Sequence, residues 1–265
     1  MARSVAVLVV FVMVTAFAVP MVAVAASAAV RGPVLLGAPV LPDVSGTTSY
    51  STNWAGYVAT ASAGQVKQVT ATWVEPKVKC GSSVSVAVFW VGIDGAVTSA
   101  PTVEQAGTFA ECVSGVASYY SWWEMYPAND IQIFAAISPG DHFSASVTYH
   151  SSSDTFTMKI KDTTSGVTYS KTSSQSGTTA STAECIAEDP GGDSATTSGL
   201  YPLADFGKVS FSSCKAKIGS SSGGIGTYST VTEEVMLNTA GTHDLALPSA
   251  LTGNSAFKVT WKASS

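Results

Sequence analysis

Residues able to do chemistry gather in four short segments that are more polar and more aromatic than the strand-like sequence around them. The segments are residues 53–57, 90–95 together with 103–107, 120–127, and 183–189. Carboxylates, an amide and several indole and phenol rings recur in them. Such groups supply acid–base catalysis and walls on which a substrate can stack.

The segment 120–127 shows how such residues can form a groove. Residues two apart on a strand share a face, so Trp122, Glu124 and Tyr126 project together. A carboxylate framed by aromatic rings has the composition of a substrate groove. The alternative is a solvated glutamate among ordinary strand aromatics.

The segment 183–189 places Glu184 and Glu188 on one face of a strand and Cys185 on the other. Two glutamates on one side of a strand are commonly its solvent-facing side. Gln105, in the second segment, carries no functional signal by itself. These two segments therefore need a wider pattern before they indicate a site.

Signatures of other enzyme classes are missing. The sequence has no Gly-x-Ser-x-Gly, His-Glu-x-x-His, Asp-Thr-Gly or Asp-Ser-Gly motif and no phosphate-binding glycine loop. His142, His150 and His243 lie far apart, and nothing nominates a serine for a triad. With 13 basic against 18 acidic residues, the composition also argues against nucleic acid as a partner.

The N-terminus predicts export. Arg3 precedes a long apolar run that ends in small residues, which is typical of a secretory signal, here residues 1–28. An uncleaved anchor is the alternative, because the run is long enough to span a bilayer. Residues 29–50 are interpreted as a linker or short pro-segment and 51–265 as one domain. We therefore expect a secreted, extracellular protein.

The elements that must position these residues are strands. Apolar and polar residues alternate with a period of two, which is typical of half-buried antiparallel strands, in 69–73, 84–90, 143–149, 156–160 and 257–261. The segments 143–149 and 156–160 are spaced as a hairpin. The hydroxyl-rich stretches 172–182 and 219–226 are interpreted as surface loops. The pattern predicts an all-β fold, a sandwich of two antiparallel sheets.

In this order, the four segments resemble the glutamic peptidases, or eqolisins, whose best-known members are fungal acid proteases. The resemblance runs from Asn53 to about Phe211. It implies a two-sheet sandwich and a catalytic pair, Gln105 and Glu184. The supporting groove residues that it implies are Asp94, Trp122, Glu124 and Tyr126. Two features depart from the family: Cys185 stands where the family has tryptophan, and the pro-segment is short.

The implied pair is chemically coherent. Glu184 can take a proton from water and return it to the leaving amine, while Gln105 donates an N–H to the oxyanion. A carboxylate with a pKa of about 4.3 is a usable base in acid, where histidine is protonated. A neutral amide partner avoids the coupling of two like charges. Glu188, on the same face, is the alternative base.

The resulting hypothesis is a secreted, monomeric acid endopeptidase that acts on polypeptides without a metal or other cofactor. The main alternative is a non-catalytic extracellular module that binds carbohydrate or protein. A glycosidase using Glu124 and Glu184 is a third hypothesis, which the spacing of the two carboxyls would decide.

The four cysteines of an exported chain predict two disulfides, for which three pairings exist. Cys185 points away from the face that carries Glu184, and Cys214 follows a strand. We expect these two to bridge neighbouring strands, which leaves Cys80 to pair with Cys112.

Overall fold

The computed structural model describes residues 40–45, 47–191 and 199–264, so the predicted signal peptide lies outside the described residues. Within these ranges the regular structure is β, apart from one 3₁₀ turn, η1 (Ile225–Thr227). The prediction of an all-β protein is confirmed. The range 29–50, interpreted as a linker or pro-segment, includes strand residues of β1 and β2.

The described residues contain no helix of the length and apolarity needed to cross a membrane.

The strands, in chain order, are β1 (Val40–Ser45), β2 (Thr48–Ser51), β3 (Trp54–Thr60), β4 (Val66–Val74), β5 (Ser85–Ile93), β6 (Val103–Val113), β7 (Val116–Tyr126), β8 (Gln132–Ala136), β9 (His142–His150), β10 (Thr155–Asp162), β11 (Thr168–Ser173), β12 (Thr182–Glu188), β13 (Lys208–Ile218), β14 (Ser221–Gly224), β15 (Val231–Leu237), β16 (Asp244–Pro248) and β17 (Phe257–Trp261). The predicted hairpin is β9 and β10, with Phe156 opposite Tyr149. Of the two stretches interpreted as loops, 219–226 contains β14.

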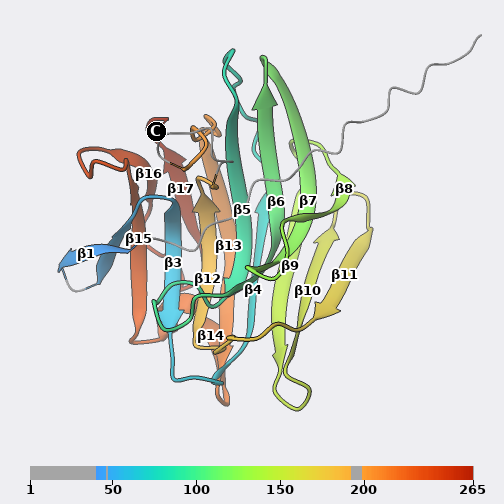
Figure 1. The fold of residues 1–265 in the computed structure, drawn as a ribbon, viewed down its shortest axis with the longest axis vertical. Helices are drawn as coiled ribbons and strands as arrows, with labels where there is room; N and C mark the ends of the chain where they lie inside the picture. Colours follow the sequence, from blue (N-terminus) through green and yellow to red (C-terminus); the bar gives the residue numbers. More distant parts are fainter. Residues whose placement is uncertain (1–39, 46, 192–198, 265) are drawn as a thin grey trace, which may run out of the picture. The chain divides into compact units, whose positions relative to one another are not determined.

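Hydrogen bonds join the strands into one array (Figure 1). Its order is β8, β7, β6, β5, β12, β3, β15, β16, β17, β13, β4, β9, β10 and β11, with β2 and β14 paired alongside. The named strands pair antiparallel throughout, except β2 with β15. The array nearly closes on itself, with β8 and β11 as its open edges.

Strand β13 explains why two separate sheets, as predicted, are not confirmed. Its first part, 208–211, pairs with β17, and its second part, 212–218, pairs with β4. The register shifts between Ser212 and Lys215, where Ser213 has a φ of 53°. Such a bulge bends a strand without ending it. One strand therefore serves both layers and links them by hydrogen bonds.

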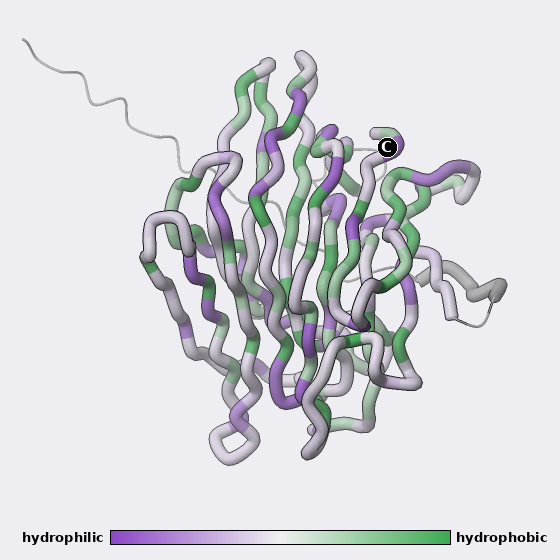
Figure 2. The backbone as a smooth tube through the Cα atoms, turned by 180° about the vertical axis from the view of Figure 1, so that it is seen from behind, coloured by the Kyte–Doolittle hydropathy of each residue, from purple (hydrophilic) through white to green (hydrophobic). Residues whose placement is uncertain are grey.

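The core follows from the alternation along the strands, which Figure 2 shows as changes between hydrophobic and hydrophilic colour. On β4, Val69, Ala71 and Trp73 are buried in the core, while Thr70 and Thr72 are only partly buried. Strand β12 differs, because all of its residues are buried. Its second face packs in a separate apolar cluster, which comprises Trp54, Val58, Val86, Val88, Trp90, Val103, Phe109, Trp122, Ile131 and Ile186.

Both predicted disulfides are present. Cys80 bonds to Cys112 with 5.4 Å between Cα atoms, and Cys185 to Cys214 with 6.3 Å. Strand β12 pairs with β3 and β5, and β13 pairs with β4, β14 and β17, so the second bond joins two strands that are not paired with each other, through the core, and not neighbouring strands as expected. It fixes the back of β12, opposite the face that carries Glu184.

Candidate active site

The turn between β6 and β7 sets the first half of the site. Ser114 and Gly115 both have positive φ, 51° and 83°, as a two-residue hairpin turn of type I′ requires. Pairing of Val113 with Val116 then places Gln105 directly opposite Glu124. Gln105 Nε2 donates a hydrogen bond of 2.7 Å to Glu124 Oε2. Sequence reasoning missed this contact, although the Ser-Gly turn was a signal for it.

The second half lies two strands away. Glu184 on β12 is opposite Gly92 on β5, and Gly92 is opposite Gln105 on β6. Residues directly opposite each other in a ladder share a face. Glu184, Gly92, Gln105 and Glu124 therefore form one row across four adjacent strands. We call this the catalytic row.

Gly92, in the middle of the catalytic row, is a position where a larger residue would not fit. A Cβ at Gly92 would lie 2.6 Å from Cζ3 of Trp90, so the indole ring occupies that space. Gly92 itself carries no side chain, and the Trp90 ring lies over its backbone between Glu184 and Gln105. The chain places an acid and an amide on either side of a position that carries only backbone.

Glu184 is fully buried, and neither of its carboxyl oxygens has a hydrogen-bond partner among the described residues. Burial raises the pKa of Glu184 well above its ordinary value; the Thr182 hydroxyl partly offsets this, and the charges of Asp94, Glu104 and Glu234 add to it. Removal of a carboxyl from water disfavours its anion. The surroundings of Glu184 therefore favour its neutral form over its anion.

Gln105 is oriented by its neighbour. One amide hydrogen points to Glu124, which leaves the other free to donate. Within the described part of the chain, the Gln105 Oε1 atom accepts no hydrogen bond. The side chain thus offers both an acceptor and a donor in a site that is buried from solvent.

Glu188 has different surroundings from Glu184. Its Oε2 accepts a 2.6 Å hydrogen bond from Trp90 Nε1, and its Oε1 accepts a 3.3 Å bond from Asn53 Nδ2. Burial raises the pKa of Glu188, while these donors oppose that rise. Both oxygens are engaged in holding the motif residues Asn53 and Trp90.

Three buried indole rings, those of Trp54, Trp90 and Trp122, pack in one apolar cluster next to the row. Trp90 contacts Trp54 edge to face, with 4.9 Å between ring centroids. Trp122 is buried in the same apolar cluster, and Tyr126, partly exposed at the end of β7, packs against it. Two of the predicted groove residues thus lie next to the row, because Trp122 and Tyr126 are two residues before and two residues after Glu124 on β7.

Asp94 is hydrogen-bonded to the segment that precedes β12. Its carboxylate accepts backbone hydrogen bonds from Thr179 (2.6 Å), Ala180 (2.7 Å) and Ser181 (2.8 Å), and it also accepts the Thr179 and Ser181 hydroxyls. Asp94 therefore anchors the segment that leads directly into β12. It acts on Glu184 by position and by charge.

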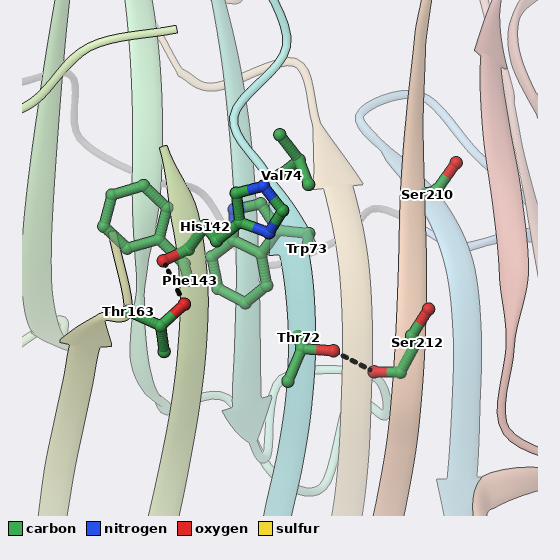
Figure 3. A pocket seen from close by; sticks show the side chains of 8 residues that line it. All are labelled: Thr72, Trp73, Val74, His142, Phe143, Thr163, Ser210 and Ser212. Atoms are coloured by element: carbon green, nitrogen blue, oxygen red, sulfur yellow. Dashed lines mark hydrogen bonds between the residues drawn. The ribbon is translucent and has the colours of Figure 1, made fainter. Parts of the chain in front are cut away.

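A hydroxyl-rich depression lies elsewhere, on β4, β9 and β13 (Figure 3). Its lining contains no carboxylate and no amide side chain, and Trp73 and Phe143 beneath it belong to the core. No cluster of three or more His, Cys, Asp or Glu among the described residues is arranged to hold a metal ion. The catalytic row remains the constellation with acid–base groups on a shared face.

The chain is similar to several known proteins. A model of the Peptidase A4 family matches residues 52–261. Aspergillopepsin-2 of Aspergillus niger is 35% identical over 207 residues, which are 68% of this chain and 70% of that protein. Scytalido-glutamic peptidase, solved with a peptide-based transition-state analogue, aligns with a TM-score of 0.66 and 25% identity over 80% of this chain and 98% of that one. Aspergilloglutamic peptidase from Aspergillus niger aligns with a TM-score of 0.57 and 27% identity over 67% and 99%.

Proposed function

Because this chain belongs to the Peptidase A4 family and is a glutamic endopeptidase, we propose that it cleaves polypeptides in acid with Glu184 and Gln105 as the catalytic pair. The observation that carries this assignment is the catalytic row, in which both side chains flank Gly92 on one face. The predicted family resemblance is confirmed, while the roles of the two residues are our proposal.

In the proposed reaction, Glu184 as a carboxylate removes a proton from water, and the water oxygen attacks the peptide carbonyl carbon. Gln105 orients the water through Oε1 and donates its free amide hydrogen to the developing oxyanion. The C–N bond then breaks as Glu184 returns the proton to the leaving nitrogen. Hydrogen bonds from water and substrate favour the anion of Glu184, which its dry surroundings otherwise disfavour.

Glu124 takes a supporting role in this scheme. Its hydrogen bond fixes the Gln105 amide so that the carbonyl end and one N–H remain available. Such preorganisation reduces what must be rearranged in the transition state. The glycosidase hypothesis is disfavoured, because the row separates Glu124 from Glu184 by three strand spacings, about 14 Å between backbones, with Gln105 between them.

We further propose that the protein is secreted. Two disulfides close within the described residues, and such bonds persist in oxidising compartments. The apolar N-terminal run, which follows Arg3 and ends in small residues, also supports export because it is typical of a secretory signal. Detection of the processed chain in the culture medium would test this part.

The enzyme assay is digestion of a denatured protein across acidic to neutral pH, with a chelator and with pepstatin as controls. Wild type should cleave in acid in the presence of either reagent, and Glu184→Gln should not cleave. Glu111→Gln, the same change on β6 outside the catalytic row, is the matched control and should cleave. Loss of activity with the chelator, or cleavage by Glu184→Gln, would contradict the mechanism.

A further inference from the structure

The loop between β11 and β12, residues 174–181, is held at both ends by the strands of the site. At its far end, Asp94 accepts the backbone N–H groups of 179–181. In its middle, a Cβ on Gly177 would lie 3.7 Å from Thr102 Cγ2. The loop therefore runs across the segment that joins β5 to β6, and it ends where the strand of Glu184 begins.

Gln175 fixes the near end of this loop. Its Nε2 donates to Glu104 Oε1 (2.6 Å) and to the Tyr126 carbonyl oxygen (2.9 Å), and its Oε1 accepts from the Ala128 N–H (3.2 Å). One side chain thus uses both amide hydrogens and its carbonyl on three separate positions. Side-chain amides with all their directions satisfied specify a single geometry.

The partners of Gln175 are adjacent to the catalytic row. Glu104 precedes Gln105 on β6, and Tyr126 lies two residues after Glu124 on β7. The loop itself leads to Glu184 on β12. Gln175 therefore links two parts of the site. Its bonds join β6 and β7, which carry Gln105 and Glu124, to the loop that leads into β12, which carries Glu184.

Building on the proposed function, we propose that Gln175 is a positioning residue, which ties the loop 174–181 to β6 and β7 and so holds Glu184 in line with Gln105. It contacts neither reacting group. Its loss should lower kcat more than it changes KM, because a shift of about 1 Å between catalytic groups can reduce turnover by about 100-fold. We expect Gln175→Ala to lose about tenfold or more in kcat.

Gln175→Glu tests the contact by its pH dependence. The titratable group that contacts position 175 is Glu104 of β6, and the charges of Asp94 and Glu184 are coupled to that of Glu104. In acid, the introduced carboxyl is protonated and can still donate one hydrogen bond to Glu104. As pH rises, two adjacent carboxylates repel each other. Activity of this variant should therefore fall at lower pH than that of wild type, whereas Gln175→Ala should be impaired at every pH.

The matched control is Gln132→Ala. Gln132 also bonds to backbone carbonyls next to the site, but to those of its own turn, Asp130 and Ile131. Hydrogen exchange of the resting protein gives a readout that needs no activity: peptides covering 128 and 175–181 should exchange faster in Gln175→Ala than in Gln132→Ala. Unchanged exchange in both peptides, or a kcat and pH profile equal to those of Gln132→Ala, would overturn the proposal. An inactive wild type would refute the proposed function alone, since exchange still decides the role of Gln175.

Discussion

Glu184 and Glu188 lie four residues apart on one face of β12, and only their surroundings distinguish them. Glu184 has no hydrogen-bond partner among the described residues, while Glu188 holds Trp90 and Asn53. We expect Glu184→Gln to reduce peptide hydrolysis to background with normal folding. Glu188→Gln should keep measurable turnover, because an amide oxygen can still accept the Trp90 N–H.

The measurement is cleavage of a peptide substrate in acid, with circular dichroism as the check on folding. If Glu188→Gln abolishes cleavage while Glu184→Gln stays active, the base has been assigned to the wrong carboxylate.

Gln105 and Glu124 form the other half of the row, and their variants should differ in size of effect. Gln105→Ala removes an oxyanion donor, a loss that typically costs about 100- to 1,000-fold in turnover. Glu124→Gln should cost less, since it disturbs only the orientation of Gln105. The double variant Glu184→Gln with Gln105→Ala should be little worse than Glu184→Gln, because residues that act together are not additive. Additive losses in single-turnover kinetics would argue against a shared step.

At the level of the strand, a substitution at Gly92 should affect both packing and catalysis, because Gly92 contacts the Trp90 ring and lies between Glu184 and Gln105. An alanine there brings a methyl group to 2.6 Å from the Trp90 ring, which its bond to Glu188 restrains. Overpacking of this kind costs about 1–3 kcal/mol, and it would displace the indole ring that lies over Gly92 between Glu184 and Gln105. We expect Gly92→Ala to lower both the melting temperature and kcat.

The control is Gly81→Ala, since a Cβ at Gly81 meets no atom within 4 Å. Thermal denaturation and initial rates should be unchanged in that variant. Equal behaviour of the two variants would mean that the strand spacing at Gly92 tolerates a side chain.

Several strands could be predicted from the sequence because their alternation records a single buried face. The hairpin of β9 and β10 and the inward side chains of β4 are examples. Strand β12 could not be interpreted this way, since its second face is buried as well. The bulge in β13 that joins the two layers depends on contacts with strands distant in sequence. The alternation of apolar and polar residues along β13 therefore could not predict it.

The candidate site was predictable in part. The order of the motifs identified Gln105 and Glu184. It does not say which residues of neighbouring strands lie opposite each other, so the position of Gly92 between them is known only from the strand pairing in the structure. The family resemblance alone implies Asp94 as a groove residue; its bonds to 179–181 depend on a loop more than 80 residues away. Gln175 lies in a hydroxyl-rich stretch with no local signal.

For the molecule as a whole, buried carboxyls predict the pH dependence of stability. Burial raises the pKa of Glu75 to about 8 and, with the charge of Asp94, that of Glu104 to about 8. A carboxyl with a raised folded-state pKa contributes stability that is fully present below its unfolded value, near 4.5, and is lost as pH rises through the folded value. The melting temperature should therefore be highest in acid and fall between about pH 4.5 and 8.

Glu75→Gln provides the check, because Glu75 lies outside the catalytic row and neither carboxyl oxygen has a partner in the described residues. Its amide stays neutral, so the variant should lose less stability than wild type as pH rises toward 8. In acid, the two proteins should unfold at similar temperatures. A wild-type melting temperature that rises between about pH 4.5 and 8 would contradict the account.

The incomplete closure of the array bears on how the protein stays dispersed. A net charge of −5 at pH 7 falls to zero near a pI of about 5.1 and becomes positive below it, so repulsion between molecules is weakest near that pH. Unpaired strand edges are templates for association, and β8 and β11 are such edges. Here Phe134 of β8 stacks on Tyr169 of β11, and Lys171 lies 5.5 Å from the ring centre of Trp123. These side-chain contacts join the two edges of the array, and we expect them to limit the pairing of either edge with another molecule where the net charge is low.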